Sequence, residues 1–139
     1  MTKDQHGFSL VELIVVIAIM AVLVGVLAPA YLSYIEKSRR QKDETAASEI
    51  YRAAEIVVYA GEYDISDQVL LSFSSAGIQL STEIENLTEV EQILKDHFGD
   101  QYNSVVPVSK KYKNRTYTIT ILPPLEDSCI PRISGSWSS

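Results

Sequence analysis

The sequence has very little cysteine and carries no charge over one long stretch. Cys129 is the only cysteine among 139 residues, which excludes an intramolecular disulfide. Bases are the minority charge: 12 Lys and Arg against 18 Asp and Glu give a net charge of −6, which argues against direct nucleic-acid binding. No residue from Leu13 to Ala30 is charged. Internal repeats and low-complexity segments are also absent, apart from a polar tail at 135–139.

The uncharged stretch is long enough to cross a membrane. With residues 8–11 it reaches the roughly 20 apolar residues that a bilayer-spanning helix needs. A secretory signal peptide fits poorly, because a short polar leader ends in Gly7 and the apolar tract runs on into a polar helical pattern without a cleavage site. Glu12 is a carboxylate inside this tract, where insertion costs up to about 3.5 kcal/mol. A function for Glu12 is therefore the default hypothesis.

The residues around Gly7 resemble the class III signal of type IV pilins and pseudopilins. The resemblance rests on the run GFSLVE at 7–12 and on the uninterrupted apolar helix with Pro29 that follows, and it covers about residues 7–39. It implies cleavage between Gly7 and Phe8, N-methylation of Phe8, and a role for Glu12 in filament assembly. The implied partners are other copies of the chain and other pilins, a prepilin peptidase/N-methyltransferase, the assembly platform with its motor ATPases, and the membrane.

Elementary physical chemistry gives Glu12 a specific partner. Cleavage after Gly7 would leave an amine on Phe8, and the bilayer interior offers a carboxylate few other partners. A neighbouring subunit that is shifted along the helix axis could supply this amine, and the pair would fix the register between subunits. The alternative is that Glu12 lies close enough to the helix start to reach interfacial water.

Two residues that disfavour helices lie inside the apolar tract. Gly25 and Pro29 cost about 1 and about 3 kcal/mol in a helix in water, and membranes tolerate both better. One interpretation is a simple kink at Pro29. The other is that residues 22–28 unwind or stretch when subunits pack in a filament.

The charges on either side of the tract disagree with the resemblance on topology. Only Lys3 precedes the tract, whereas four bases follow it, so the positive-inside rule alone places the C-terminal region in the cytoplasm. The resemblance implies a single pass through the cytoplasmic membrane with the head outside, and we follow it because acidic residues interleave with those bases. The four bases form a cluster that consists of Lys37, Arg39, Arg40 and Lys42. In one interpretation this cluster contacts anionic headgroups or other subunits, and in the other it is a solvated helix face.

The rest of the chain predicts an α+β fold, in which a long N-terminal helix carries a small head with an antiparallel sheet of about three to four strands. Apolar residues recur at helical spacing over 46–58, so the helix is expected to run from Phe8 to Ala60. The head is short for an independent core and is expected to complete it against this helix. The expected segments are a leader at 1–7, a membrane and filament-core helix at 8–30, an amphipathic half at 31–60 and the head at 61–139.

Within the head, one helix and several strands are expected. Residues 86–99 predict a second helix that Gly99 ends. Alternation over 115–122 predicts a strand with one buried face, with 104–109 as its hairpin partner. Residues 130–133 predict an edge strand because of Pro131. Residues 69–73 stay ambiguous between a strand and a loop.

Side chains suited to catalysis are scarce. His97 is the only histidine left once the leader is removed, so a zinc cluster and a Ser-His-Asp triad both lack their parts, and we expect neither an enzyme nor a metal or cofactor. The acidic pairs at 64 and 67 and at 126 and 127 are interpreted as solvated loops, with calcium binding as the alternative. Cys129 is expected to be buried, with a bridge between subunits as the alternative.

These features predict a structural subunit of a type IV pilus. It would be held in the cytoplasmic membrane and polymerised through its N-terminal helix into a surface filament that serves adhesion, motility or DNA uptake. An alternative in the same structural class is a pseudopilin of a type II secretion or competence machine. An alternative of another class is a monomeric signal-anchored envelope protein whose head binds a ligand, and an intact leader on the mature protein would favour it.

Overall fold

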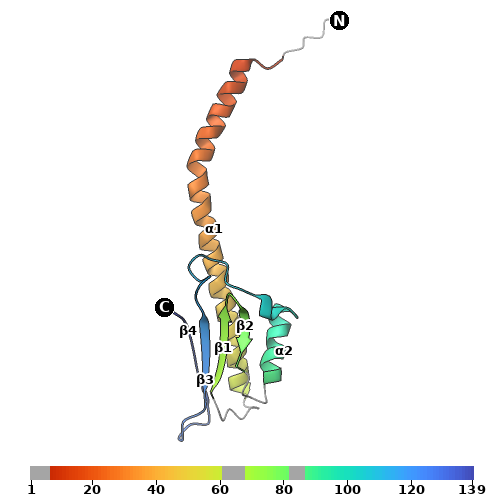
Figure 1. Ribbon diagram of the computed structural model, residues 1–139, viewed down its shortest axis with the longest axis vertical. Coiled ribbons are helices and arrows are strands. Elements are labelled where there is room, and N and C mark those ends of the chain that lie inside the picture. Colours follow the sequence, from red (N-terminus) through yellow and green to blue (C-terminus); the bar gives the residue numbers. More distant parts are fainter. Residues whose placement is uncertain (1–6, 61–67, 82–86) are drawn as a thin grey trace. The chain divides into compact units, whose positions relative to one another are not determined.

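A computed structural model of the chain describes residues 7–60, 68–81 and 87–139. The described elements are a long helix α1, a shorter helix α2, a 3-10 turn η1 and four strands (Figure 1). The chain divides into two compact units, Met1–Lys37 and Ser38–Ser139, and α1 contributes residues to both.

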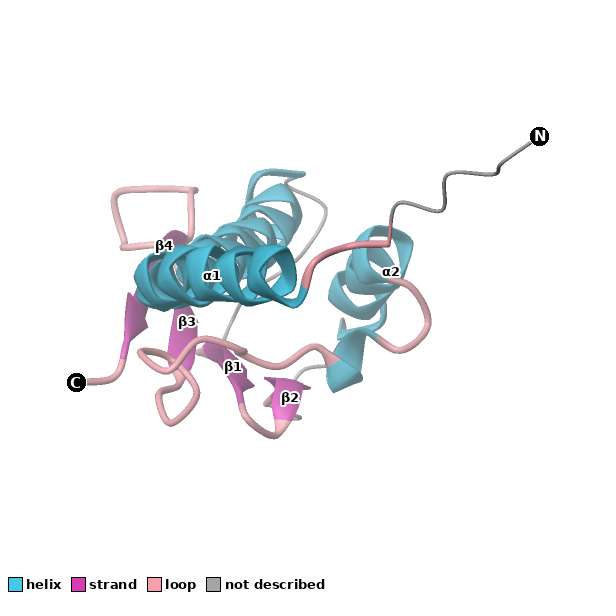
Figure 2. Cartoon of the chain, turned by 90° about the horizontal axis from the view of Figure 1, so that it is seen from above, coloured by secondary structure: helices cyan, strands magenta, loops and turns pink. Residues whose placement is uncertain are grey.

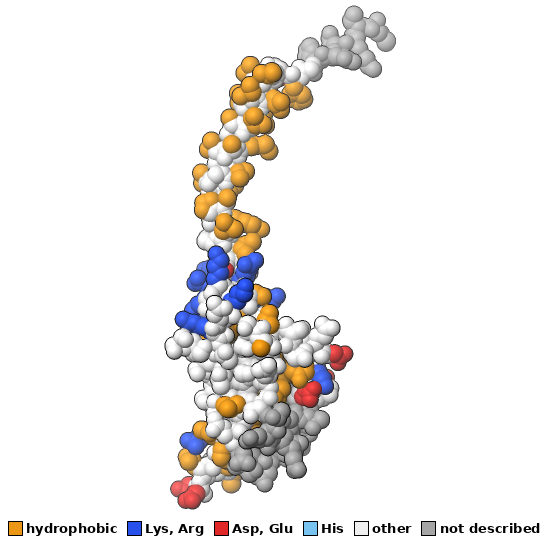
Figure 3. Space-filling view, in the orientation of Figure 1, with side chains coloured by type: hydrophobic (Ala, Val, Ile, Leu, Met, Phe, Trp, Pro, Cys, Tyr) orange, Lys and Arg blue, Asp and Glu red, His pale blue; other side chains and the backbone are white. Residues whose placement is uncertain are grey.

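The first unit consists of the apolar part of α1, which spans Leu10–Ala60. The large apolar side chains of this part are open to the surroundings, with exposed fractions from 49% at Val15 to 74% at Leu10. They form the hydrophobic stretch along α1 in Figure 3. Among the described helices this one is long and apolar enough to cross a membrane. Such a surface is stable only when lipid or another protein covers it.

In the second unit, α1 buries one face against the head. The buried residues recur at helical spacing, as the pattern over 46–58 predicts. Most of them are alanines, whose small side chains let the helix backbone approach its neighbours closely. They are Ala47, Ile50, Ala53, Ala54 and Val58.

The head contains one antiparallel sheet of four strands, in the order β2-β1-β3-β4 (Figure 2). The predicted α+β fold is therefore confirmed. Residues 69–73, which the sequence left ambiguous, lie in a strand, and the predicted alternation over 115–122 has its buried face at Ile119 and Ile121. The strands are β1 (Val69–Ser74), β2 (Gly77–Leu80), β3 (Tyr117–Leu122) and β4 (Arg132–Trp137).

The predicted hairpin between 104–109 and β3 is wrong. Residues Tyr102–Ser104 form η1, and a loop follows it. The backbone N–H groups of Val108 and Ser109 donate to the carboxylate of Asp43 on α1 instead of to a neighbouring strand. The strands that pair with β3 are β1 and β4.

The edge strand near the C-terminus is confirmed, but it begins and ends later than predicted. The prediction of a polar tail is wrong for Gly135–Trp137, which belong to β4. The indole of Trp137 stacks on the ring of Tyr112 with 4.2 Å between centroids and lies 5.8 Å from the ring of Phe73. These aromatic contacts fix the end of β4 against the head.

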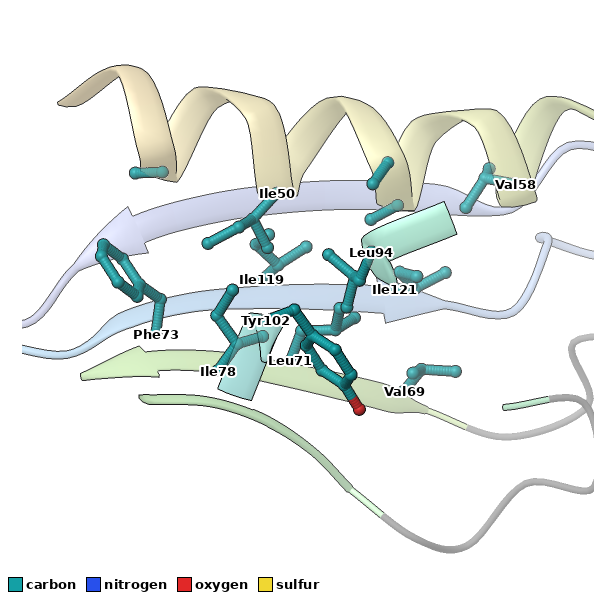
Figure 4. Packing of buried hydrophobic residues seen from close by; sticks show 13 residues of the cluster. Ile50, Val58, Val69, Leu71, Phe73, Ile78, Leu94, Tyr102, Ile119 and Ile121 are labelled. Atoms are coloured by element: carbon teal, nitrogen blue, oxygen red, sulfur yellow. The ribbon is translucent and has the colours of Figure 1, made fainter. Parts of the chain in front are cut away.

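The core of the head lies where α1, the sheet and α2 meet. Figure 4 shows Ile50 of α1 pointing toward Ile119 of β3, among buried side chains of β1 and β2. The helix α2 (Leu87–Phe98) adds Leu94, and η1 adds Tyr102. As predicted, Gly99 ends α2, with φ at 83° and its N–H donating to the carbonyl oxygen of Lys95.

Gly77 allows the backbone of β2 to touch η1. Its φ is 94°, and a Cβ built at this position would overlap the carbonyl oxygen of Asn103. Gly99 has a similar φ of 83°, but a Cβ there would meet no atom within 4 Å. The two glycines therefore separate the cost of a positive φ from the cost of a clash.

We predict that Gly77→Ala lowers the free energy of unfolding by about 3 to 4 kcal/mol, because backbone strain and overpacking both act there. Gly99→Ala should cost only about 1 kcal/mol, since strain acts alone. Thermal unfolding of the full chain in detergent, followed by near-ultraviolet circular dichroism, measures both. Equal losses for the two variants would contradict the close approach of β2 and η1.

Candidate functional site

The expected cleavage site lies outside the helix. Gly7, Phe8 and Ser9 have no helical backbone, and α1 begins at Leu10 instead of at the predicted Phe8. The side chain of Phe8 is 94% exposed, and no atom lies within 4 Å of the place where a Cβ of Gly7 would stand. The Gly7–Phe8 bond therefore lies in a non-helical, uncrowded segment, which suits access by a peptidase.

Glu12 and Ser9 cap the start of α1 together. The N–H of Ser9 donates to Oε2 of Glu12 at 2.8 Å, and the N–H of Val11 donates to Oγ of Ser9 at 3.3 Å. Two of the backbone donors that a helix start leaves without partners are thus satisfied, as in a capping box. The prediction for Glu12 overlooked this arrangement, although the spacing Ser-x-x-Glu at 9–12 is the signal for it.

The cap limits what Glu12 can do in the uncleaved chain. Before cleavage the nitrogen of Phe8 is part of a peptide bond, so it carries no charge that could pair with the carboxylate. A carboxylate has two oxygens, so Oε1 can accept an amine while Oε2 keeps the N–H of Ser9. The arrangement is compatible with the predicted pairing of Glu12 with the amine of Phe8, which stays a prediction.

Gly25 and Pro29 lie four residues apart in α1 and affect the same backbone hydrogen bond. The helix runs through both residues without a break. Proline has no N–H, so the i to i−4 bond that residue 29 would make to the carbonyl oxygen of Gly25 cannot form. Gly25 adds no side chain to stiffen the same turn. The two residues therefore weaken one turn of the helix, as both interpretations of the sequence require.

In the head, His97 and two tyrosines lie close to other polar side chains. Nε2 of His97 lies 3.7 Å from Oε2 of Glu49 at the end of α2. Tyr102 is buried, and burial together with the neighbouring carboxylate of Glu91 raises the pKa of its hydroxyl. Burial also raises the pKa of Tyr117, with a smaller contribution from Tyr51.

The acidic pairs fall in two different places. Asp64 and Asp67 lie outside the described residues. Glu126 and Asp127 are exposed in the connection between β3 and β4. Among the residues that the structure describes, no group of three His, Cys, Asp or Glu side chains is placed to hold a metal ion.

The prediction that Cys129 is buried is wrong. Its side chain is exposed in the 123–131 connection, where Leu125 and Ile130 are also more than half exposed. Small apolar residues are usually buried. Here, however, the connection lies outside the cluster of buried residues that α1, the sheet and α2 form, so residue type alone misleads.

The chain thus has an exposed apolar helix with a carboxylate in its first turn, preceded by a non-helical Gly-Phe bond and followed by an α+β head, and these features suggest anchoring in a membrane. Comparison with known proteins agrees. The family described as the prokaryotic N-terminal methylation motif matches residues 2–28. No solved structure matches the chain.

Several relatives carry pilus-related names. Prepilin peptidase-dependent protein A of Clostridium perfringens is 31% identical over 119 residues, covering 78% of this chain and 83% of the relative. A fimbrial protein of Pseudomonas aeruginosa is 27% identical over 125 residues, covering 78% and 81%. The type IV major alpha-pilin of Moraxella bovis is 35% identical over 80 residues, covering 55% and 49%. The chain belongs to the type IV pilin family.

We predict that Ser9→Ala frays the start of α1 in the uncleaved chain. The N–H of Val11 loses its acceptor, and loss of such a cap costs about 1 kcal/mol. Amide hydrogen exchange at Val11 in detergent micelles should accelerate by about fivefold. Ser33→Ala is the matched control, because the hydroxyl of Ser33 donates to the carbonyl oxygen of Ala30 and caps no N–H. Equal exchange in the two variants would refute the cap.

Proposed function

We propose that the chain is a structural subunit of a type IV pilus. A prepilin peptidase/N-methyltransferase cuts between Gly7 and Phe8 and methylates Phe8. The mature subunit spans the cytoplasmic membrane once, with its head outside the cytoplasm. The assembly platform and its motor ATPases then move it into a surface filament. In the filament its neighbours are copies of itself and other pilins.

The observation that carries this proposal is the exposed apolar part of α1 with Glu12 in its first turn. From Leu10 to Leu27 the helix has apolar side chains on every side, and the large ones are about half exposed or more. Lipid can cover such a surface before assembly, and the same part of other subunits can cover it afterwards. One segment can therefore serve as an anchor and as a filament core.

Glu12 favours the filament over the lipid bilayer. In lipid its carboxylate is costly, and the N–H of Ser9 compensates only part of that cost. Cleavage would create an amine on Phe8, four residues before Glu12 in the same chain. A neighbouring subunit that is shifted along the axis would bring its own amine to the free carboxylate oxygen. Pairing then stabilises the filament relative to the separate subunits.

Mass spectrometry of material sheared from the cell surface tests the proposal. We expect long filaments that contain this chain, with an N-terminal peptide that starts at Phe8 and carries one methyl group on its amine. A trace of processed chain that stays in the envelope would favour the pseudopilin alternative. A mature chain that keeps Met1 to Gly7 would favour the signal-anchored envelope protein and contradict the proposal.

We predict that Glu12→Gln lowers the yield of sheared filaments by about 100-fold. The variant leaves the new amine without a counter-charge in a water-free core, and such an unpaired charge costs about 3 kcal/mol or more. The amount in the membrane and the cleavage after Gly7 should stay unchanged. Glu126→Gln, in an exposed loop of the head, is the control for loss of one carboxylate. Filaments at the normal yield from Glu12→Gln would rule out the pairing.

A further inference from the structure

The head concentrates positive charge in one place, although the chain as a whole is acidic. The chain has 12 Lys and Arg, and half of them lie in two short segments of the second unit, 39–42 and 110–113. All of these side chains are exposed. We call them the basic patch, which consists of Arg39, Arg40, Lys42, Lys110, Lys111 and Lys113.

A buried carboxylate brings the two segments together. Asp43 is only 2% exposed, and its Oδ1 and Oδ2 each accept one backbone N–H at 2.8 Å, from Val108 and from Ser109. The hydroxyl of Tyr112 donates to Oε1 of Glu44 at 2.7 Å and adds a second tie between the loop and α1. The bases of the loop are thereby fixed beside the bases of α1, more than 60 residues away in the sequence.

The loop is built to present its lysines. The N–H of Lys113 donates to the carbonyl oxygen of Ser109 at 2.9 Å, which closes one tight turn. The ammonium of Lys111 lies 4.6 Å from the centre of the Tyr112 ring and 2.7 Å from its hydroxyl oxygen. That ring in turn stacks on Trp137. These contacts hold the ammonium of Lys111 in place, which lowers the entropy that this side chain loses when it binds a ligand.

The charge of the patch is only partly compensated from within. Three carboxylates stand beside its six bases in the sequence, Glu36, Asp43 and Glu44, so the bases remain in excess. Arg40 and Lys110 also have interactions within the chain. Asp43 is enclosed by the loop, and Glu44 accepts the hydroxyl of Tyr112. Figure 3 shows Lys and Arg side chains gathered over α1 in the region that follows its apolar stretch. The patch therefore suits a ligand that carries several negative charges.

The position of the patch along α1 identifies that ligand. Tyr31 and Tyr34, 63% and 69% exposed, lie near the end of the apolar stretch, and exposed tyrosines of this kind mark the level of lipid headgroups. Arg39 follows Tyr34 by only five residues in the sequence, so the bases of the patch begin soon after the tyrosines that end the apolar stretch. Lysine and arginine stems are long enough to reach phosphates from there.

We propose that the basic patch binds the headgroups of anionic phospholipids and holds the head against the membrane before assembly. The inference rests on the membrane anchoring in the proposed function, but it does not rest on filament formation. Each base near an anionic surface strengthens binding by about fivefold, and salt weakens the attraction. The buried Asp43 then has a role beyond packing, because its two hydrogen bonds help to fix the loop that carries the lysines against α1.

Lipid titration of the full-length chain tests the proposal. Native mass spectrometry of the chain in detergent micelles with increasing phosphatidylglycerol gives its apparent affinity, with phosphatidylcholine as the neutral reference. We expect a preference for phosphatidylglycerol that falls as salt rises. The double variant Lys110→Gln/Lys113→Gln should lower the affinity for phosphatidylglycerol by about tenfold or more. Lys111 is left intact because it packs on Tyr112.

The control is Arg52→Gln/Arg132→Gln, which removes two exposed charges of the same sign outside the patch. It should change the affinity by less than about twofold. Near-ultraviolet circular dichroism from the stacked Trp137 verifies that both double variants fold. Equal losses in the two double variants, or equal binding of phosphatidylcholine, would overturn the proposal.

Two further outcomes separate this proposal from the proposed function. If the patch variant keeps its phosphatidylglycerol affinity but yields fewer filaments, the patch contacts another subunit and the lipid assignment is wrong. If the unmodified chain forms no filaments but loses phosphatidylglycerol affinity only when the patch is changed, the lipid site is supported and the filament role is contradicted.

Discussion

The structure depends on one helix, α1, whose first part is apolar and exposed and whose second part packs against the head. In its first part α1 has apolar side chains on every side, and these side chains are exposed. In its second part only one face is apolar, and the buried residues at 47, 50, 53, 54 and 58 organise the core of the head. The change from one pattern to the other falls in the charged segment that follows Ile35. The sheet, α2 and the loop at 105–116 all rely on the second part of the helix.

Local patterns in the sequence were sufficient for the elements whose partners lie nearby or whose faces are uniform. The helical spacing over 46–58, the alternation in β3 and the glycine after α2 each predicted what the structure contains. The failures came from long-range contacts. Residues 104–109 have the composition of a strand, but Asp43, 65 and 66 residues away, takes the N–H groups that a strand would use. Such a partner is visible only in the folded chain.

The candidate site shows the same division. Gly7, Phe8 and Glu12 were predicted as site residues from their order along the chain, and their roles stay predictions. The family model matches the segment that contains them, residues 2–28. The prediction did not include Ser9 as the partner of Glu12, although the spacing Ser-x-x-Glu is typical of a helix cap. The carboxylate thus has a local partner in the uncleaved chain. On the proposed function it gains a second partner, in another subunit, only after cleavage.

The proposed filament depends on contact between Glu12 of one subunit and the amine of Phe8 in another. Solid-state NMR of filaments grown from a mixture of nitrogen-labelled and carbon-labelled subunits measures this contact directly, because any nitrogen-to-carbon signal must then join two different chains. We predict a signal between the amine nitrogen of Phe8 and the side-chain carboxyl carbon of Glu12. If that signal is absent from mixed filaments and occurs only when both labels lie in one chain, the pairing is within a subunit and the account is contradicted.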